Sequence, residues 1–94
     1  MIELKETVEW MGSEDYRERF LAEYWQTKIR YEKLKEFVNK IEVAELMGWA
    51  EPPHICPKEL LREQQRRMGE YLGVLEKRAI IEQIELSDRK ENVE

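Results

Sequence analysis

The residues best suited to binding chemistry lie in the second half of the chain, where arginines cluster. Arg62, Arg66 and Arg67 fall within two helical turns, and Tyr71 follows one turn later. Guanidinium groups bind phosphate oxygens through paired hydrogen bonds, and an aromatic ring can stack on a nucleobase. This combination predicts a site for a small anionic nucleotide. The alternative is a solvated helix face whose charges serve no ligand.

A polar stripe extends the arginine cluster along the same predicted helix. Its members recur at spacings of four and three residues, which places them on one helix face: Gln64, Met68, Tyr71, Leu75 and Arg78. Polar groups on a packed face need hydrogen-bond partners. Gln64 and Arg78 are therefore expected to contact a ligand, a second copy of the chain, or a network within the chain that includes Tyr24 and either Glu23 or Glu82.

The chain lacks the residue types that catalysis and metal binding require. It has one histidine and one cysteine, His54 and Cys56, and no glycine-rich phosphate loop. The pair supplies only half of the ligands of a structural zinc site, and a single cysteine cannot form an intrachain disulfide. We expect no enzyme activity, no metal and no cofactor.

Composition limits the remaining possibilities. Ninety-four residues make one domain, and a net charge of −5 argues against general nucleic-acid binding, which requires a basic surface. No apolar run reaches the roughly 18–20 residues that span a bilayer, so no membrane partner and a cytoplasmic location are expected.

The strongest pattern predicts a long helix over residues 13–47. Ser13 is suited to the N-cap, and Gly48 is suited to the left-handed position after the last turn. Between them an apolar seam repeats at spacings of four and three residues. Its members are Phe20, Tyr24, Thr27, Tyr31, Leu34, Val38 and Ile41.

Prolines end this helix and begin a second one. Residues 48–56 form a proline-rich corner, and Pro57 fits the first turn of a helix over residues 57–86, followed by a mobile tail over 87–94. The second apolar seam comprises Leu61, Met68, Leu72, Leu75, Ala79 and Leu86. Two such helices are expected to lie antiparallel, with Ile41 opposite Leu61 and Tyr31 opposite Tyr71.

One hairpin interior cannot bury all the apolar residues. Those outside the seams are Leu21, Trp25, Ile29, Phe37, Leu60, Val74, Ile80, Ile81 and Ile84. We therefore expect a homo-oligomeric helical bundle, together with a short helix over residues 2–11 that packs through Leu4, Val8 and Met11. Alternating Ile2, Leu4, Val8 and Trp10 would also suit a strand. Whether this segment packs in its own chain or swaps into another stays open.

The second predicted helix resembles a family of small proteins encoded by phages and prophages of Gram-positive bacteria. The shared pattern LLxxQ…MxxYxxxLxxR is carried by Leu60-Leu61-Arg62-Glu63-Gln64, then Met68, Tyr71-Leu72, Leu75-Glu76 and Arg78. The first helix adds Glu23-Tyr24, Lys28, Arg30, Lys33-Leu34 and Phe37-Val38. The resemblance covers about residues 20–80.

This resemblance implies a non-enzymatic phage protein that acts in the cytoplasm of an infected bacterium. One hypothesis is an oligomeric counter-defence sponge that sequesters a small (cyclic) nucleotide immune signal at a site between chains. Its expected contacts are Arg62, Arg66, Arg67 and Tyr71. A second is an inhibitor or adaptor that docks on a host defence protein through Trp25, Phe37 or Trp49. A structural accessory of the virion is a third.

Overall fold

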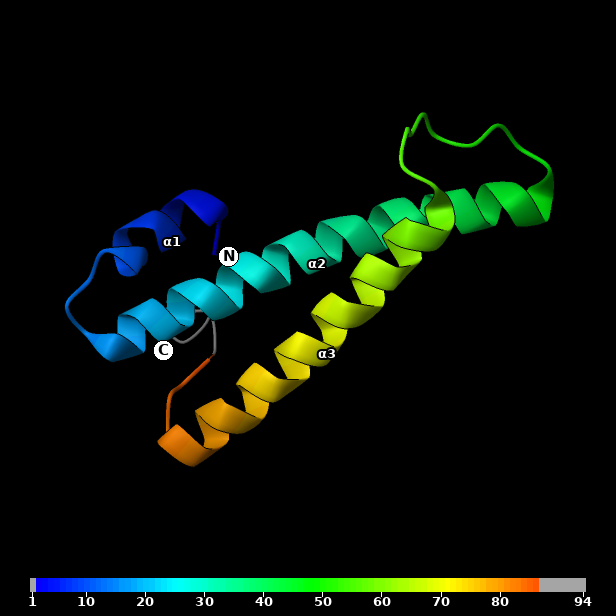
Figure 1. The fold of residues 1–94 in the computed structure, drawn as a ribbon. Helices are drawn as coiled ribbons and strands as arrows, with labels where there is room; N and C mark the ends of the chain where they lie inside the picture. The colour runs from blue at the N-terminus through cyan, green and yellow to red at the C-terminus, as the bar shows by residue number, and fades with distance from the viewer. Residues whose placement is uncertain (1, 87–94) are drawn as a thin grey trace, which may run out of the picture.

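The computed structural model describes residues 2–86, so the predicted tail over 87–94 lies outside the described residues. Its helices are α1 (Leu4–Met11), α2 (Tyr16–Met47) and α3 (Lys58–Glu82), and this part of the chain contains no strand. Figure 1 shows α1 and α3 on different sides of the long α2. The predicted all-α fold, with one short and two long helices, is confirmed.

Helix α2 begins three residues after the predicted start, because Asp15 rather than Ser13 provides its cap. The Asp15 carboxylate accepts a hydrogen bond from the Arg17 amide at 2.9 Å, while the Ser13 hydroxyl accepts one from the Asp15 amide at 3.0 Å. The helix ends at Gly48, whose φ of 71° lies in the left-handed region that favours glycine. The predicted end of the helix at Gly48 therefore agrees with the structure.

Helices α2 and α3 form the antiparallel hairpin, joined by the corner that follows Gly48 (Figure 1). The Tyr24 hydroxyl donates to Glu76 at 2.9 Å, near the open end. In the middle, Gly69 rather than Tyr71 lies opposite Tyr31. The predicted pairing of Tyr31 with Tyr71 is therefore wrong by two residues, and the Tyr71 hydroxyl donates to Glu23 instead.

The hydrophobic core occupies the end of the hairpin away from the corner. Its buried members come from both long helices and from the segment after α3: Phe20, Leu21, Tyr24, Leu72, Leu75, Ala79 and Ile84. Trp10, Trp25, Tyr31 and Leu86 pack against it. A smaller buried group near the corner comprises Val38, Ile41 and Ala44. Two packed regions thus hold the hairpin, one toward each end.

Helix α1 packs on α2, but not through the predicted face. Val8 and Met11 are 62% and 54% exposed, whereas Thr7 is fully buried. The Thr7 hydroxyl donates to the Leu4 carbonyl at 2.6 Å and accepts from the Gln26 amide at 3.0 Å. The predicted Leu4–Val8–Met11 face is wrong because this polar pair, with the neighbouring apolar residues, fixes a different side of α1 against α2.

Burial of Leu75 should dominate the stability of the hairpin. Replacing Leu75, which is 1% exposed, with alanine should lower the free energy of unfolding by about 2–5 kcal/mol, because it removes packed methyl groups and leaves a cavity. The matched control Leu46→Ala, at a position 84% exposed, should change it by less than about 0.5 kcal/mol. Urea denaturation measures both; equal losses would contradict the placement of the core.

Candidate functional site

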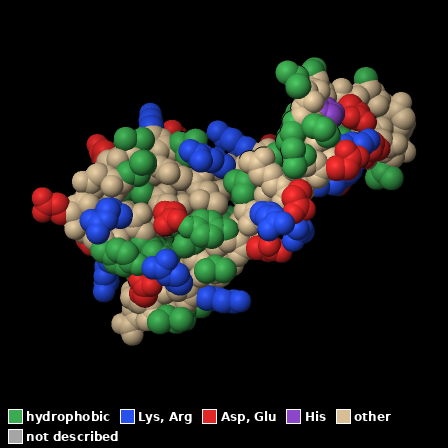
Figure 2. Space-filling view, in the orientation of Figure 1, with side chains coloured by type: hydrophobic (Ala, Val, Ile, Leu, Met, Phe, Trp, Pro, Cys, Tyr) green, Lys and Arg blue, Asp and Glu red, His purple; other side chains and the backbone are tan. Residues whose placement is uncertain are grey.

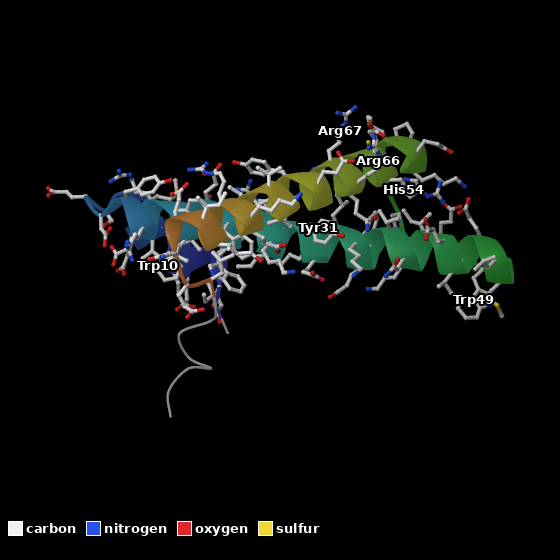
Figure 3. All side chains as sticks on the ribbon, turned by 90° about the horizontal axis from the view of Figure 1, so that it is seen from below. Trp10, Tyr31, Trp49, His54, Arg66 and Arg67 are labelled. Carbon is white, nitrogen blue, oxygen red and sulfur yellow. The ribbon has the colours of Figure 1, made fainter. Side chains whose placement is uncertain are left out.

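An open cleft lies between α2 and α3, between the two packed regions of the hairpin. Its volume is about 570 Å³, within the range of small-molecule sites. It is lined by Tyr31 and Glu42 of α2 and by Arg62, Gln65, Arg66, Gly69 and Glu70 of α3. Figure 3 shows Tyr31 between the two helices and Arg66 on α3. The cleft brings two guanidinium groups and a phenol ring together.

Gly69 provides the space for the Tyr31 ring in this cleft. A Cβ atom added at Gly69 would lie 3.2 Å from Cε1 of Tyr31 and 3.4 Å from its hydroxyl. Such contacts are closer than normal packing allows, so any larger residue would displace the ring. The close approach of helix backbone and aromatic ring therefore depends on glycine at this position.

Acidic side chains hold both arginines of the cleft. Arg62 donates from Nε to Glu42 at 2.8 Å and from Nη2 to Glu45 at 2.9 Å. Arg66 donates to Glu63 at 2.7 Å and to Glu70 at 2.9 Å. Hydrogen bonds from Arg66 and Arg67 hold the pKa of the Glu63 carboxyl below its ordinary value. Each guanidinium group is therefore held by two carboxylates in this structure.

The structure divides the six predicted ligand-binding residues among three places. Arg62 and Arg66 line the cleft, whereas Gln64, Arg67 and Tyr71 line a separate groove of about 390 Å³. Figure 3 shows Arg67 extending from α3 away from α2. Consecutive residues lie about 100° apart around a helix, so Arg66 and Arg67 line different depressions, although both donate to the same carboxylate of Glu63. The sixth residue, Arg78, lies near the far end of α3.

Arg78 belongs to a network between the N-terminal turn of α2 and the end of α3. Its guanidinium donates to the Tyr16 hydroxyl at 2.5 Å and to Glu82 at 3.1 Å, and the Tyr16 hydroxyl donates to Glu82 at 2.8 Å. The same guanidinium lies 5.2 Å from the centre of the Phe20 ring. A structural role with Glu82, which was one of the alternatives from the sequence, accounts for the contacts of Arg78.

A second cleft, between α1 and α2, contains residues that the sequence reasoning missed. It measures about 660 Å³, and basic groups at its edge include Lys5, Lys28 and Lys33. The indole N–H of Trp25 is buried beside it and has no acceptor among the described residues. The spacing of Trp25, Lys28 and Lys33 along one side of α2 was the available signal. Glu32 and Glu36 in the same segment make the basic character of this side of α2 hard to recognise from the sequence.

Of the three predicted interaction residues, Trp49 alone is largely exposed. Trp25 packs against the core, and the Phe37 ring lies edge-on to His54 with 6.2 Å between ring centres. Trp49 is 60% exposed, and Figure 3 places it near the end of α2. Figure 2 shows hydrophobic side chains near the histidine of the corner. The three aromatics therefore do not form one exposed face.

His54 fixes the corner through both of its ring nitrogens. Nδ1 lies 2.7 Å from the Cys56 carbonyl, and Nε2 lies 3.0 Å from the Glu51 carboxylate. Both partners are acceptors, so a doubly protonated ring satisfies both. No group of three or more potential metal ligands occurs within residues 2–86. No helix in that range is long and apolar enough to cross a membrane.

The His54 ring should titrate above its ordinary pKa of 6.5, because the hydrogen bonds to Glu51 and to the Cys56 carbonyl favour the charged form. Its contribution to stability is then complete below pH 6.5 and is lost as the pH rises through the raised pKa. An NMR titration of the single histidine measures this directly. Glu51→Gln should lower the pKa, and a wild-type value at or below 6.5 would refute the arrangement.

Fold and clefts define a class: a small helical hairpin with an open, arginine-lined cleft between its long helices. The family model described as Sequestin matches residues 14–81, which include α2, the corner and nearly all of α3. The chain belongs to the Sequestin family. It matches no curated protein and no solved structure.

Two glycines of α3 provide a matched test of the cleft. Gly73→Ala should raise the free energy of unfolding by about 0.5–1 kcal/mol, because alanine is the better helix former and a Cβ there meets no atom within 4 Å. Gly69→Ala should raise the free energy of unfolding by less, because its Cβ must displace the Tyr31 ring. Thermal or urea unfolding distinguishes them. Equal stabilisation would show that Tyr31 does not occupy the observed position.

Proposed function

We propose that this protein sequesters a small anionic nucleotide by stoichiometric binding, with no chemical change to the ligand. The observation that carries the proposal is the cleft in which Arg62 and Arg66 lie beside the Tyr31 ring. Two guanidinium groups suit phosphate oxygens, and the ring suits a base. The family name, Sequestin, supports sequestration as the mode of action.

The ion pairs of the cleft are compatible with ligand exchange. The Arg66 side chain is 54% exposed, and its partner Glu70 is 62% exposed. Exposed ion pairs contribute little to stability, so a phosphate group can replace a carboxylate on the guanidinium at small cost. The released carboxylates regain water. Meanwhile the second pair, to Glu63, keeps Arg66 oriented before the ligand arrives.

A binding role is also supported by what lines the cleft. Its described lining has no histidine, cysteine or serine that could act as nucleophile or base toward a phosphate ester. The resemblance to phage-encoded proteins supports a place in the cytoplasm of an infected bacterium, where removal of a nucleotide immune signal would protect the phage. The proposed ligand class includes cyclic nucleotides, whose phosphates and bases suit the same guanidinium groups and ring.

A second candidate function is inhibition of a host defence protein, and the tip of the hairpin favours it. Large apolar side chains are exposed there on α2 and the corner: Val43, Leu46, Met47, Trp49 and Ile55. A groove of about 430 Å³ beside Trp49 could receive a side chain of a partner. Exposed aromatic residues of this kind are common anchors of protein interfaces.

A thermal-shift screen against linear and cyclic nucleotides tests the proposal. A ligand at 100 times its dissociation constant stabilises the native state by about 2.7 kcal/mol, which raises the midpoint by several degrees in a domain of this size. Calorimetry with the best ligand then gives the stoichiometry. Chromatography of the released ligand should recover it unchanged. Recovery of a hydrolysed product would contradict sequestration. If no nucleotide raises the melting midpoint, a protein target is favoured.

Matched variants locate the site. Arg66→Gln should weaken binding at least tenfold, because it removes a charged phosphate contact worth about 1.4 kcal/mol or more. The control Arg67→Gln removes the neighbouring arginine, which shares Glu63 but lines the other groove, and should leave affinity nearly unchanged. Lys28→Gln probes the cleft beside α1. Loss of binding in Lys28→Gln alone would move the site to that cleft.

A further inference from the structure

The cleft between α2 and α3 is lined by two kinds of polar side chain, which differ in whether their hydrogen bonds are already formed. The charged ones, two arginines and two glutamates, form ion pairs with one another. The uncharged ones are Gln65 and Tyr31, and both are partly buried. Neither the Gln65 amide nor the Tyr31 hydroxyl makes a hydrogen bond with any residue in the described range 2–86. The cleft therefore offers a ligand two uncharged groups that the described fold does not use.

Both uncharged groups lie near Gly69. Gln65 precedes Gly69 by four residues, so the two positions share one face of α3 and lie about 6 Å apart along the helix axis. The Tyr31 hydroxyl oxygen would lie 3.4 Å from a Cβ atom at Gly69, and Figure 3 shows Tyr31 between the two helices. A flat ligand beside the Tyr31 ring is therefore within about one helical turn of the Gln65 amide.

The ion pairs limit which part of a nucleotide each group of the cleft can bind. A phosphate is charged, so it can replace a carboxylate on Arg62 or Arg66. The edge of a nucleobase is neutral and does not displace a carboxylate from a guanidinium group. Recognition of the base therefore depends on the uncharged groups. The Gln65 amide suits this role, because its nitrogen donates hydrogen bonds and its oxygen accepts them.

We propose that Gln65 selects an adenine base, which lies against the Tyr31 ring while the phosphate binds the arginines. This inference rests on the proposed function and names the base of its ligand. Adenine has a donor next to an acceptor on two edges, N6 with N7 and N6 with N1, and a glutamine amide pairs with such an edge through two hydrogen bonds. The O6 and N7 atoms of guanine are both acceptors and suit arginine, whose donors are occupied here by carboxylates.

The adjacent Gln64 does not share this position. It lines the separate groove with Tyr71, about 100° around the helix from Gln65. Its amide nitrogen lies 3.8 Å from the Met68 sulfur. The two glutamines are neighbours of the same residue type, and each lines a different depression of the surface. Gln64 is therefore a matched control for Gln65.

Calorimetry of the full chain with AMP, IMP and GMP tests the base preference, because these monophosphates differ only in the base. The wild-type chain should bind AMP at least about fivefold more tightly than IMP or GMP, as expected for one bidentate base contact. Gln65→Leu should remove this preference by weakening AMP alone. The control Gln64→Leu should leave all three affinities unchanged. Circular dichroism shows whether each variant stays folded.

Gln65→Glu gives a readout that a merely structural role would not produce. It keeps the length of the side chain but replaces the amide donor with an acceptor, so it should weaken AMP and favour GMP, whose N1 and N2 groups donate. An equal loss for all three nucleotides would overturn the inference, as would wild-type binding without preference for AMP.

Failure of this inference can be distinguished from failure of the proposed function. Binding that is lost in Arg66→Gln but shows no preference among AMP, IMP and GMP would support the cleft and overturn the role of Gln65. If none of the three binds, the inference fails, and the thermal-shift screen with other linear and cyclic nucleotides decides the proposed function separately.

Discussion

Two long helices have one shared interior, and the packing of α2 against α3 determines everything else in this structure. The interior is closed around Leu75, which is 1% exposed, and around Ile41 near the corner, also 1% exposed. Between these points Gly69 has no side chain, and the Tyr31 ring lies beside it. The cleft therefore lies between the two regions in which α2 and α3 pack closely.

The same constraint explains the distribution of charge. A chain in which 39% of residues are charged cannot bury them, so its acids and bases form pairs along the rims of the hairpin. Arg62 bridges the two helices through Glu42 and Glu45, and Lys58 contacts Glu45 near the corner. These contacts hold the pKa of Glu45 below its ordinary value, the bond from Lys58 having the largest effect. Positive groups remain available to a ligand only where their carboxylate partners are exposed and exchangeable.

The sequence predicted the helices well, because the signals for them are local. Proline and glycine end α2 and precede α3, and the 4,3 seam identifies Phe20, Tyr24, Val38 and Ile41, all of which are buried. The sequence predicts Ser13 as the cap, whereas the structure uses Asp15, which is also a residue type suited to that position. The choice between them depends on the turn that precedes the helix, where Ser13 bonds to Asp15 itself.

The site was harder to predict because it depends on rotation around α3 and on contacts from other elements. Arg66 and Arg67 are adjacent in sequence and share Glu63, but the packing of Leu72 and Leu75 fixes α3 so that Arg66 lines the cleft and Arg67 lines the groove with Gln64 and Tyr71. Likewise, no pattern within residues 2–11 predicts the burial of Thr7, because its hydrogen-bond partner Gln26 is on α2. The burial and orientation of such residues depend on their partners on other helices.

A protein that removes a ligand by stoichiometric capture depends on the number of clefts and on their affinity, since no turnover regenerates free sites. Preorganised guanidinium groups favour affinity because little side-chain entropy remains to be lost on binding. In the proposed function, the ion pairs that neutralise Arg62 and Arg66 would therefore orient these side chains before a ligand enters the cleft.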